Sequence, residues 1–477
     1  MEYGLVALWL VAYAVLSAIA LPIAGRAFPR FSGGAAGLAP TVALGVLTLA
    51  GYVAGHASMT LALPAGLGAL LVLGVAAALD WTAVRQRLRD GSDGPSDDGG
   101  NGDDVGPLLV SEPPLSVTVD RRALAETGAV FVVGFLFVVA IRVLDPAVAP
   151  LGGEKFLDFG LLQTLARADA LPPEDMWFAG EPVQYYYGGH LTATLLSQLT
   201  ATPPRFAYNL ALAGFYATLV TAAYGLAGAI GRHRGVPRHV AGGFAVVFVG
   251  LASNLLTAGR LVLGWLPSGL QRSIAERVAA RSDRFTAADL LEGVEEFSYW
   301  TASRVIEGTI NEFPLFAWLN GDLHAHMMGT PFLLLSAALA YSYYLTPERQ
   351  RWRRRGIVFV AVPLLSSLLA IVDTWSFPSA FGLLVLAVAL APADPLSLFP
   401  TSVARQVRTL VGVTPAELRG RSPTALRAEA LRPGAALVVG ILAGTIGLVL
   451  AAPFLLGAAG GGREVSLLPA TARSSLS

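Results

Sequence analysis

Acidic and basic groups occur together in the stretch "GGEKFLDF", at a spacing that could support chemistry. Glu154 and Asp158 are four residues apart, so on a helix that starts after Gly153 their carboxylates share one face, with Lys155 one step round. Paired carboxylates can act as a general base or hold a divalent cation. A solvated helix face gives the same spacing, and this alternative stays open.

Acidic and imidazole groups alternate in "NGDLHAH". On an extended segment Asp322, His324 and His326 all point to one side, as ligands of a divalent metal would, whereas on a helix they would fan apart. Structural hydrogen bonding is the alternative. Glu312 precedes this run, and we expect it to cap or line the same cavity.

Two further positions are candidates for substrate binding. In "DTWSFP", a turn between two apolar stretches, Asp373 is held near membrane depth with Trp375 beside it. A helix cap explains Asp373 equally well. Lys155 is the only lysine among 33 basic residues, and its compact ammonium suits a phosphate, although chance survival explains it as well.

Hydroxyls and an imidazole are crowded together in "EPVQYYYGGH". Successive helical residues lie about 100° apart, so Tyr185, Tyr186 and Tyr187 cannot all face one ligand. For any single tyrosine an interfacial aromatic belt is the simpler interpretation. Together with His190, the cluster suits a pocket that accepts a polar sugar beside a lipid tail.

The composition predicts a polytopic membrane protein that positions these groups with helices. Of the 477 residues 54% are hydrophobic and 14% charged, the net charge is zero, and there is no cysteine. The balance of charge gives no indication of nucleic-acid binding, and no disulfide or thiolate metal site can form. We expect an all-α bundle of about ten spans, near 4–24, 36–54, 60–80, 123–144, 207–231, 240–262, 327–345, 357–372, 377–392 and 434–457.

Clusters of arginine predict the orientation, because short basic loops stay cytoplasmic. All basic clusters lie inside if 186–199 is a juxtamembrane helix and not a span. Segments 145–206 and 263–326, the turn at 373–376 and the C-terminal tail then face outward. We divide the chain into N-terminal helices (1–89), an acidic cytoplasmic linker predicted to be disordered (90–122) and a core (123–477).

Several motifs together resemble one family: "EKFLDF", "PPEDMWFAGEPVQYYYGGH", "PPRFAYNLAL", "NEFPLFAWLNGDLHAHMM" and "DTWSFP". They are similar to those of the YYY-motif membrane proteins of archaea and Chloroflexi, which look like distant relatives of the GT-C glycosyltransferases. The resemblance implies a GT-C-like fold and a polyprenyl-phosphate sugar donor. It also implies a catalytic acid in the first outer loop, here Glu154 or Asp158.

The function predicted is therefore glycosyl transfer on the outer face of the cell membrane. Lys155 and a divalent cation, Mg²⁺ or Mn²⁺, at Asp322, His324 and His326 would offset charge on the leaving phosphate. The tyrosines and His190 would orient donor or acceptor. A transporter of a polar or lipid-linked substrate and a non-catalytic assembly subunit are the alternatives.

Overall fold

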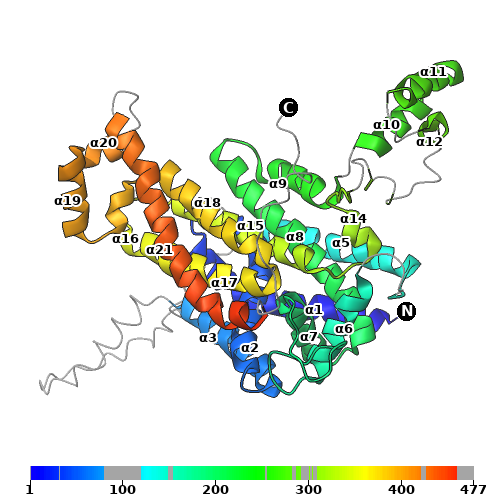
Figure 1. Ribbon diagram of the computed structural model, residues 1–477, viewed down its shortest axis with the longest axis horizontal. Coiled ribbons are helices and arrows are strands. Elements are labelled where there is room, and N and C mark those ends of the chain that lie inside the picture. The colour runs from blue at the N-terminus through cyan, green and yellow to red at the C-terminus, as the bar shows by residue number, and fades with distance from the viewer. Residues whose placement is uncertain are drawn as a thin grey trace, which may run out of the picture.

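The computed structural model describes residues 2–31, 33–79, 120–148, 154–252, 255–281, 286–291, 300, 303–304, 309–419 and 426–458. These residues form helices and connecting turns with no strand among them (Figure 1). The all-α class predicted from the sequence is confirmed. Most of the linker, 90–119, lies outside the described residues, as do 149–153 in the first outer loop.

Seven of the described helical stretches are long and apolar enough to cross a membrane. They are α1 (Tyr3–Ala27), α2 (Ala35–Gly55), α3 (Met59–Ala78), α5 (Arg121–Leu144), α8 (Pro204–His233), the stretch of α16 (Arg351–Gly356), η3 (Ile357–Ala361) and α17 (Val362–Val372), and α21 (Leu426–Ala458). Two shorter apolar helical segments accompany them, α9 (Arg238–Val246) with η1 (Val247–Leu251), and η4 (Thr374–Ser376) with α18 (Phe377–Leu390). The helix α15 (Ala325–Tyr344) is also largely buried.

One expected span, 240–262, is interrupted. The π-helical turn η1 ends at Leu251, the next residue, Ala252, has an extended backbone, and α10 (Leu255–Gly264) begins further along the chain. The fourteen residues of α9 and η1 rise roughly 21 Å at 1.5 Å per residue, short of the ~30 Å hydrocarbon core. Ser253 and Asn254 follow Ala252 in the sequence, and polar residues of these types are preferred where a helix begins, so the sequence held a signal that one span over 240–262 disregards.

Shorter helices form the connections. Between α5 and α8 lie α6 (Lys155–Arg167) and α7 (Gly188–Leu199). After α10 come α11 (Ser268–Ala279), α12 (Ala287–Leu291) and α14 (Phe316–Asn320), and between α18 and α21 come η5 (Pro395–Leu398), α19 (Thr401–Val411) and α20 (Pro415–Arg419). With twelve residues α7 is too short to span a bilayer, as expected for 186–199.

The bundle has two chemically different ends. At one, which we call the arginine end, Arg353 donates to the carbonyls of Arg26 and Ala27, and Arg238 pairs with Glu126 at 2.9 Å. The 24 residues of α5 rise roughly 36 Å from this end to the other, where Asp158 and His324 lie. We call that second end the site end. In Figure 1 α16, α19 and α20 lie at the left, and α6 and α14 at the right.

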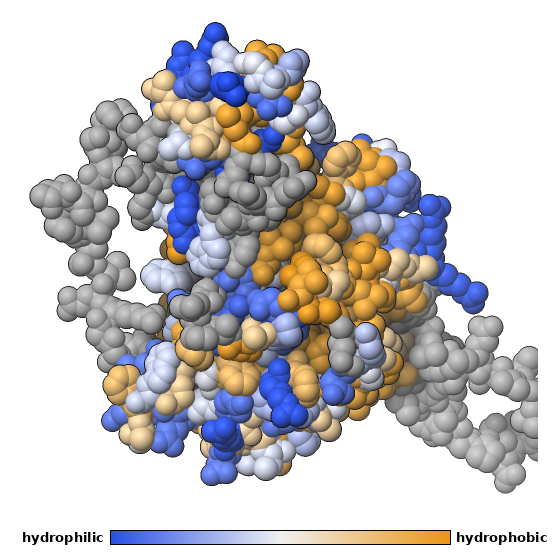
Figure 2. Space-filling view, turned by 90° about the vertical axis from the view of Figure 1, so that its right-hand side faces the viewer, coloured by the Kyte–Doolittle hydropathy of each residue, from blue (hydrophilic) through white to orange (hydrophobic). Residues whose placement is uncertain are grey.

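The sides of the bundle are apolar and exposed. Val72 of α3, Val133 of α5 and Val449 of α21 are each about two-thirds exposed. Figure 2 shows a continuous hydrophobic area bordered by hydrophilic residues above and below. An exposed apolar surface on helices long enough to cross a bilayer supports a multi-pass membrane location.

Candidate functional site

Asp158 lies on the buried face of α6. The buried positions of this helix recur at helical spacing, so the carboxyl faces the same way as the leucines that hold α6 on the bundle; they are Lys155, Asp158, Leu161, Leu162 and Leu165. Asp158 is fully buried, whereas Glu154, the residue before the helix, keeps 55% of its side chain exposed. The two acids therefore meet different surroundings.

His190 lies directly against this carboxyl. It is in the first turn of α7, where Gly188 packs so closely that an added Cβ would lie 2.8 Å from the Ile371 carbonyl oxygen. Complete burial lowers the pKa of His190 to about 3, so the imidazole is neutral. Its Nε2–H donates to Asp158 Oδ1 at 3.2 Å and fixes the orientation of the carboxyl.

A turn after α14 supplies the other members of the site. Gly321 ends the helix with φ +74°, a left-handed conformation that favours glycine. The following residues are extended, and the Leu323 N–H donates to the Tyr208 hydroxyl at 3.0 Å. Asp322 Oδ2 accepts from the Glu154 N–H at 3.4 Å, which joins this turn to the start of α6.

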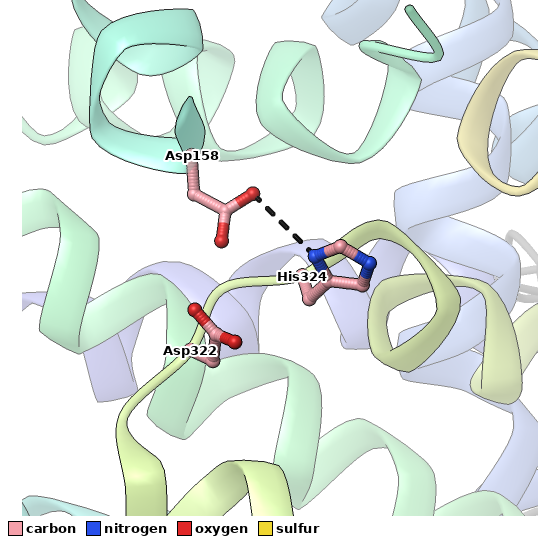
Figure 3. A group of neighbouring side chains, drawn as sticks. All are labelled: Asp158, Asp322 and His324. Atoms are coloured by element: carbon pink, nitrogen blue, oxygen red, sulfur yellow. Dashed lines mark ion pairs between the residues drawn. The ribbon is translucent and has the colours of Figure 1, made fainter. Parts of the chain in front are cut away.

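Three potential ligand atoms converge there (Figure 3). One ligand atom each from Asp158, Asp322 and His324 lies within 4.8 Å of the others, and His324 Nδ1 is 3.9 Å from Asp158 Oδ1. Asp158 Oδ2 and Asp322 Oδ1 are buried without a hydrogen-bond partner, and His324 Nδ1, which also makes no hydrogen bond, lies 3.3 Å from Glu154 Oε2. Buried polar atoms are nearly always paired, so unpaired carboxylate oxygens on two aspartates of this group fit a bound cation.

The electrostatics of the cluster agree with this fit. Burial raises the pKa of Asp158 well above its ordinary value. Burial and the neighbouring Asp158 raise the pKa of Asp322 to about 7. Burial lowers the pKa of His324, so its nitrogen stays available as a ligand. Two carboxyls this close disfavour each other's ionisation unless a proton or a cation lies between them.

The donor set also favours particular ions. Carboxylate oxygens suit Mg²⁺, Ca²⁺ and Mn²⁺, while imidazole nitrogen suits Zn²⁺ and other transition metals. Two carboxylates with one imidazole therefore fit Mn²⁺ or Zn²⁺ better than Mg²⁺. The described residues offer this one group of three ligands.

His326 does not join these three side chains. The extended run ends at His324, because α15 begins at Ala325, so His326 lies on a helix and turns to another partner. Its Nε2–H donates to Glu312 Oε2 at 2.9 Å, and this hydrogen bond lowers the pKa of Glu312. The two imidazole rings remain neighbours, with centroids 4.7 Å apart. Both His326 and Glu312 are about two-fifths exposed.

Two buried cations lie beside the cluster. Lys155 Nζ is 3.8 Å from Asp145 Oδ2, and Arg142 Nη1 is 3.4 Å from the same oxygen. Both cationic side chains are almost fully buried, while Asp145 is 61% exposed. Burial and the nearby Arg142 lower the pKa of Lys155. Sequence reasoning missed Arg142, although an arginine in the last turn of an apolar span, at its predicted outer end, was the signal that could have found it.

The tyrosines divide between the site and the core. Tyr185 and Tyr186 are partly buried with ring centroids 4.0 Å apart. Burial and the neighbouring Tyr186 raise the pKa of Tyr185, and the carboxylates of Glu154 and Asp158 add to this effect. Tyr187 is 2% exposed and packs against Phe454 at 5.8 Å. The three precede α7 and are not part of it, and Tyr187 packs in the core while the rings of Tyr185 and Tyr186 lie together.

Of the two candidate residues in the turn at 373–376, Asp373 lies near the site and Trp375 does not. Asp373 is buried, accepts from the Ser376 hydroxyl, and would collide with a Cβ at Gly329. It therefore lies against the first turns of α15. Trp375 is 74% exposed and points away from the protein. Its ring is placed to contact lipid or an interface, not the cluster of ligands.

The fold and this arrangement define a polytopic all-α membrane protein with ionisable groups gathered at one end of its bundle. The chain belongs to the family described as "Uncharacterized membrane protein (DUF2298)", whose model matches residues 8–477. No curated protein and no solved structure matches the chain. Family membership supports the predicted membrane location. The resemblance to YYY-motif proteins and GT-C enzymes remains a prediction.

Proposed function

We propose that the protein is a metal-dependent glycosyltransferase that takes a sugar from a polyprenyl-phosphate donor at the outer face of the membrane. One observation supports this most strongly. Ligand atoms of Asp158, Asp322 and His324 converge beside the buried cations Arg142 and Lys155, and each of the two aspartates has a buried oxygen without a hydrogen-bond partner. A cation site next to two fixed positive charges suits a reaction in which negative charge grows on a phosphate.

The distribution of arginine supports the outward orientation of the site. Arg26, Arg238 and Arg353 gather at the arginine end, and basic residues near span ends favour the cytoplasm. The site end would then face the exterior. Ionisable groups gathered at one end of the bundle also favour an enzyme at the surface over a transporter, whose substrate site belongs near the midplane.

The residues divide naturally into roles. Glu154 is exposed and 3.3 Å from His324 Nδ1, so it is the better general base, and it would take the proton of the acceptor hydroxyl. The acceptor oxygen then bonds to the anomeric carbon, while the bond from that carbon to the phosphate oxygen breaks and its electron pair stays on the phosphate. Lys155 and Arg142 would stabilise that phosphate.

The remaining groups position the reactants. Asp158, Asp322 and His324 would hold the cation, which supplies Lewis-acid stabilisation of phosphate charge when bound. His190 orients Asp158, and Tyr185 and Tyr186 offer hydroxyls and ring faces to a sugar. The acceptor approaches from the exposed side of Glu154. His326 and Glu312 lie at the same open side and are available to its hydroxyls.

The test compares surface glycans and glycolipids from cells with and without the gene. A glycan that disappears should return with the wild-type gene and not with Asp322→Asn. Purified protein with Mn²⁺ should transfer labelled sugar from a lipid-phosphate donor, and EDTA should stop it. Unchanged glycans, or full complementation by Asp322→Asn, would reject the enzyme hypothesis.

A further inference from the structure

An apolar groove lies beside the candidate site, between the site ends of α1, α5 and α8. Its volume is about 410 Å³, within the roughly 300–1,000 Å³ typical of small-molecule sites. The first turn of α1, the last two turns of α5 and the first two turns of α8 contribute its apolar lining, Leu5, Val6, Val139, Val143, Phe206 and Leu210.

The groove is closed toward the middle of the bundle. Deeper along the helices, the Tyr13 ring of α1 lies 6.3 Å from the ring of Phe135, and a Cβ added to Gly214 of α8 would collide with the Tyr13 side chain. Of the candidate spans, α8 is 94% buried, but α1 and α5 only 22% and 33%. The groove therefore has α8 as its floor and two helices with exposed apolar faces as its walls.

The end of the groove nearest the site is polar. Arg142 and Asn209 line it, and Arg142 Nε donates to Asn209 Oδ1 at 2.9 Å. On its other side the guanidinium group lies against the backbone of Gly321, next to Asp322. Arg142 therefore stands between the apolar groove and the cluster of ligands. Glu2 also lines the groove, but it is exposed and lies at the start of α1, in the wall opposite α5.

The charge at this end is incompletely compensated. Arg142 and Lys155 share the exposed carboxylate of Asp145 at 3.4 and 3.8 Å, longer than the ~2.7–2.9 Å of a tight charge-assisted hydrogen bond. Asp322, next to Gly321, is a second carboxylate near these cations, but among the described residues it forms no close ion pair with either of them, so both cations keep capacity to bind an anion. A phosphate group has several acceptor oxygens and would form ion pairs with both cations in place of Asp145.

We infer that the groove between α1, α5 and α8 binds the hydrocarbon chain of a lipid phosphate, whose head group lies between Arg142 and Lys155. This inference rests on the proposed function, since it places the donor's lipid part beside the catalytic cluster. The chain enters from the bilayer between α1 and α5. The groove holds only the first few isoprene units, and the rest of a long chain stays in the membrane.

The probe is labelled farnesyl phosphate, offered to the protein in neutral phosphatidylcholine nanodiscs with empty nanodiscs as background. Val143→Trp fills the groove from a position that is already 40% exposed, so folding should survive. Val133→Trp is the matched control, on the same helix but outside the groove and 67% exposed. We expect Val143→Trp to weaken binding at least tenfold and Val133→Trp to leave it within twofold. Lys155→Gln should also weaken it at least tenfold.

Competition separates the two parts of the ligand. Unlabelled farnesyl phosphate should compete far better than farnesol, which lacks the charge, and than inorganic phosphate, which lacks the chain. Equal binding by the two tryptophan variants, or inorganic phosphate that competes as well as the lipid, would overturn the inference. Farnesyl phosphate carries no sugar, so binding without glycosyl transfer would reject the proposed function alone, and transfer that survives Val143→Trp would reject the groove alone.

Discussion

Replacing Asp322 by asparagine should separate two effects of this carboxylate: its charge destabilises the metal-free protein, and it binds the metal. In the folded protein burial and Asp158 raise the pKa of Asp322 from 3.8 to about 7. A carboxyl with a raised pKa binds its proton more tightly when folded. The resulting stabilisation is complete below about pH 4 and is lost as the pH rises to about 7. At pH 8 the metal-free wild type therefore carries an unfavourable charge that the amide of Asp322→Asn does not.

The size of the effect follows from the shift. A change of about three pKa units at about 1.36 kcal/mol each sets an upper limit of about 4 kcal/mol on the increase in the free energy of unfolding that Asp322→Asn causes at pH 8. Because the proton is shared with Asp158, about 2 kcal/mol is the expected gain for the variant at pH 8 in EDTA. Saturating Mn²⁺, at 100 times its Kd, should stabilise the wild type by about 2.7 kcal/mol and the variant hardly at all.

The assay is thermal unfolding of purified protein, followed by tryptophan fluorescence at pH 5.5 and pH 8, with EDTA or Mn²⁺. Glu181→Gln is the matched control, since it exchanges an exposed carboxylate, in the other long segment predicted to face outward, for an amide. It should follow the wild type in all four conditions. An Asp322→Asn protein that is less stable than wild type at pH 8 in EDTA, or that Mn²⁺ stabilises as strongly, would refute the reasoning.

Three further predictions concern single side chains. Glu154→Gln should lower the transfer rate by about 10²–10⁴-fold, as for loss of a general base, while Mn²⁺ still raises the unfolding temperature. His190→Phe should lower the free energy of unfolding by about 1–3 kcal/mol, because it leaves Asp158 Oδ1 buried without its donor; chemical denaturation measures this. Gly214→Val should destabilise by at least about 1–3 kcal/mol through collision with Tyr13, and an unchanged unfolding midpoint would contradict the packing of α1 on α8.

Sequence reasoning was most successful where one periodic signal decided the outcome. Apolar runs of about 20 residues must be helical in lipid, because helices satisfy their own backbone hydrogen bonds, and helices occupy most of the predicted ranges. The prediction failed at 240–262, because the apolar runs on both sides of Ala252 were joined into one span although Ser253 and Asn254 separate them. Ser and Asn are preferred residues at a helix start, so a signal for a new helix was present in the sequence.

The candidate site was predictable in its members but not in their grouping. Asp-x-His-x-His predicted a shared direction for Asp322, His324 and His326, which requires an extended backbone throughout. The start of α15 at Ala325 removes His326 from that direction, and Asp158, 164 residues earlier than Asp322, takes the third position. Residue spacing within one segment cannot show which helix, distant in the sequence, will pack against that segment.

The sequence by itself determined that this chain is a helical membrane protein and that acids, imidazoles and a lone lysine lie in the connections at one end of its helices. These properties depend on composition and on local periodicity, which act along the chain. Tertiary structure alone decided that Asp158 meets His324, that Arg142 joins Lys155, and that Tyr187 turns into the core. Those contacts depend on how α5, α6, α7 and α8 are rotated against one another, and packing between helices sets that rotation.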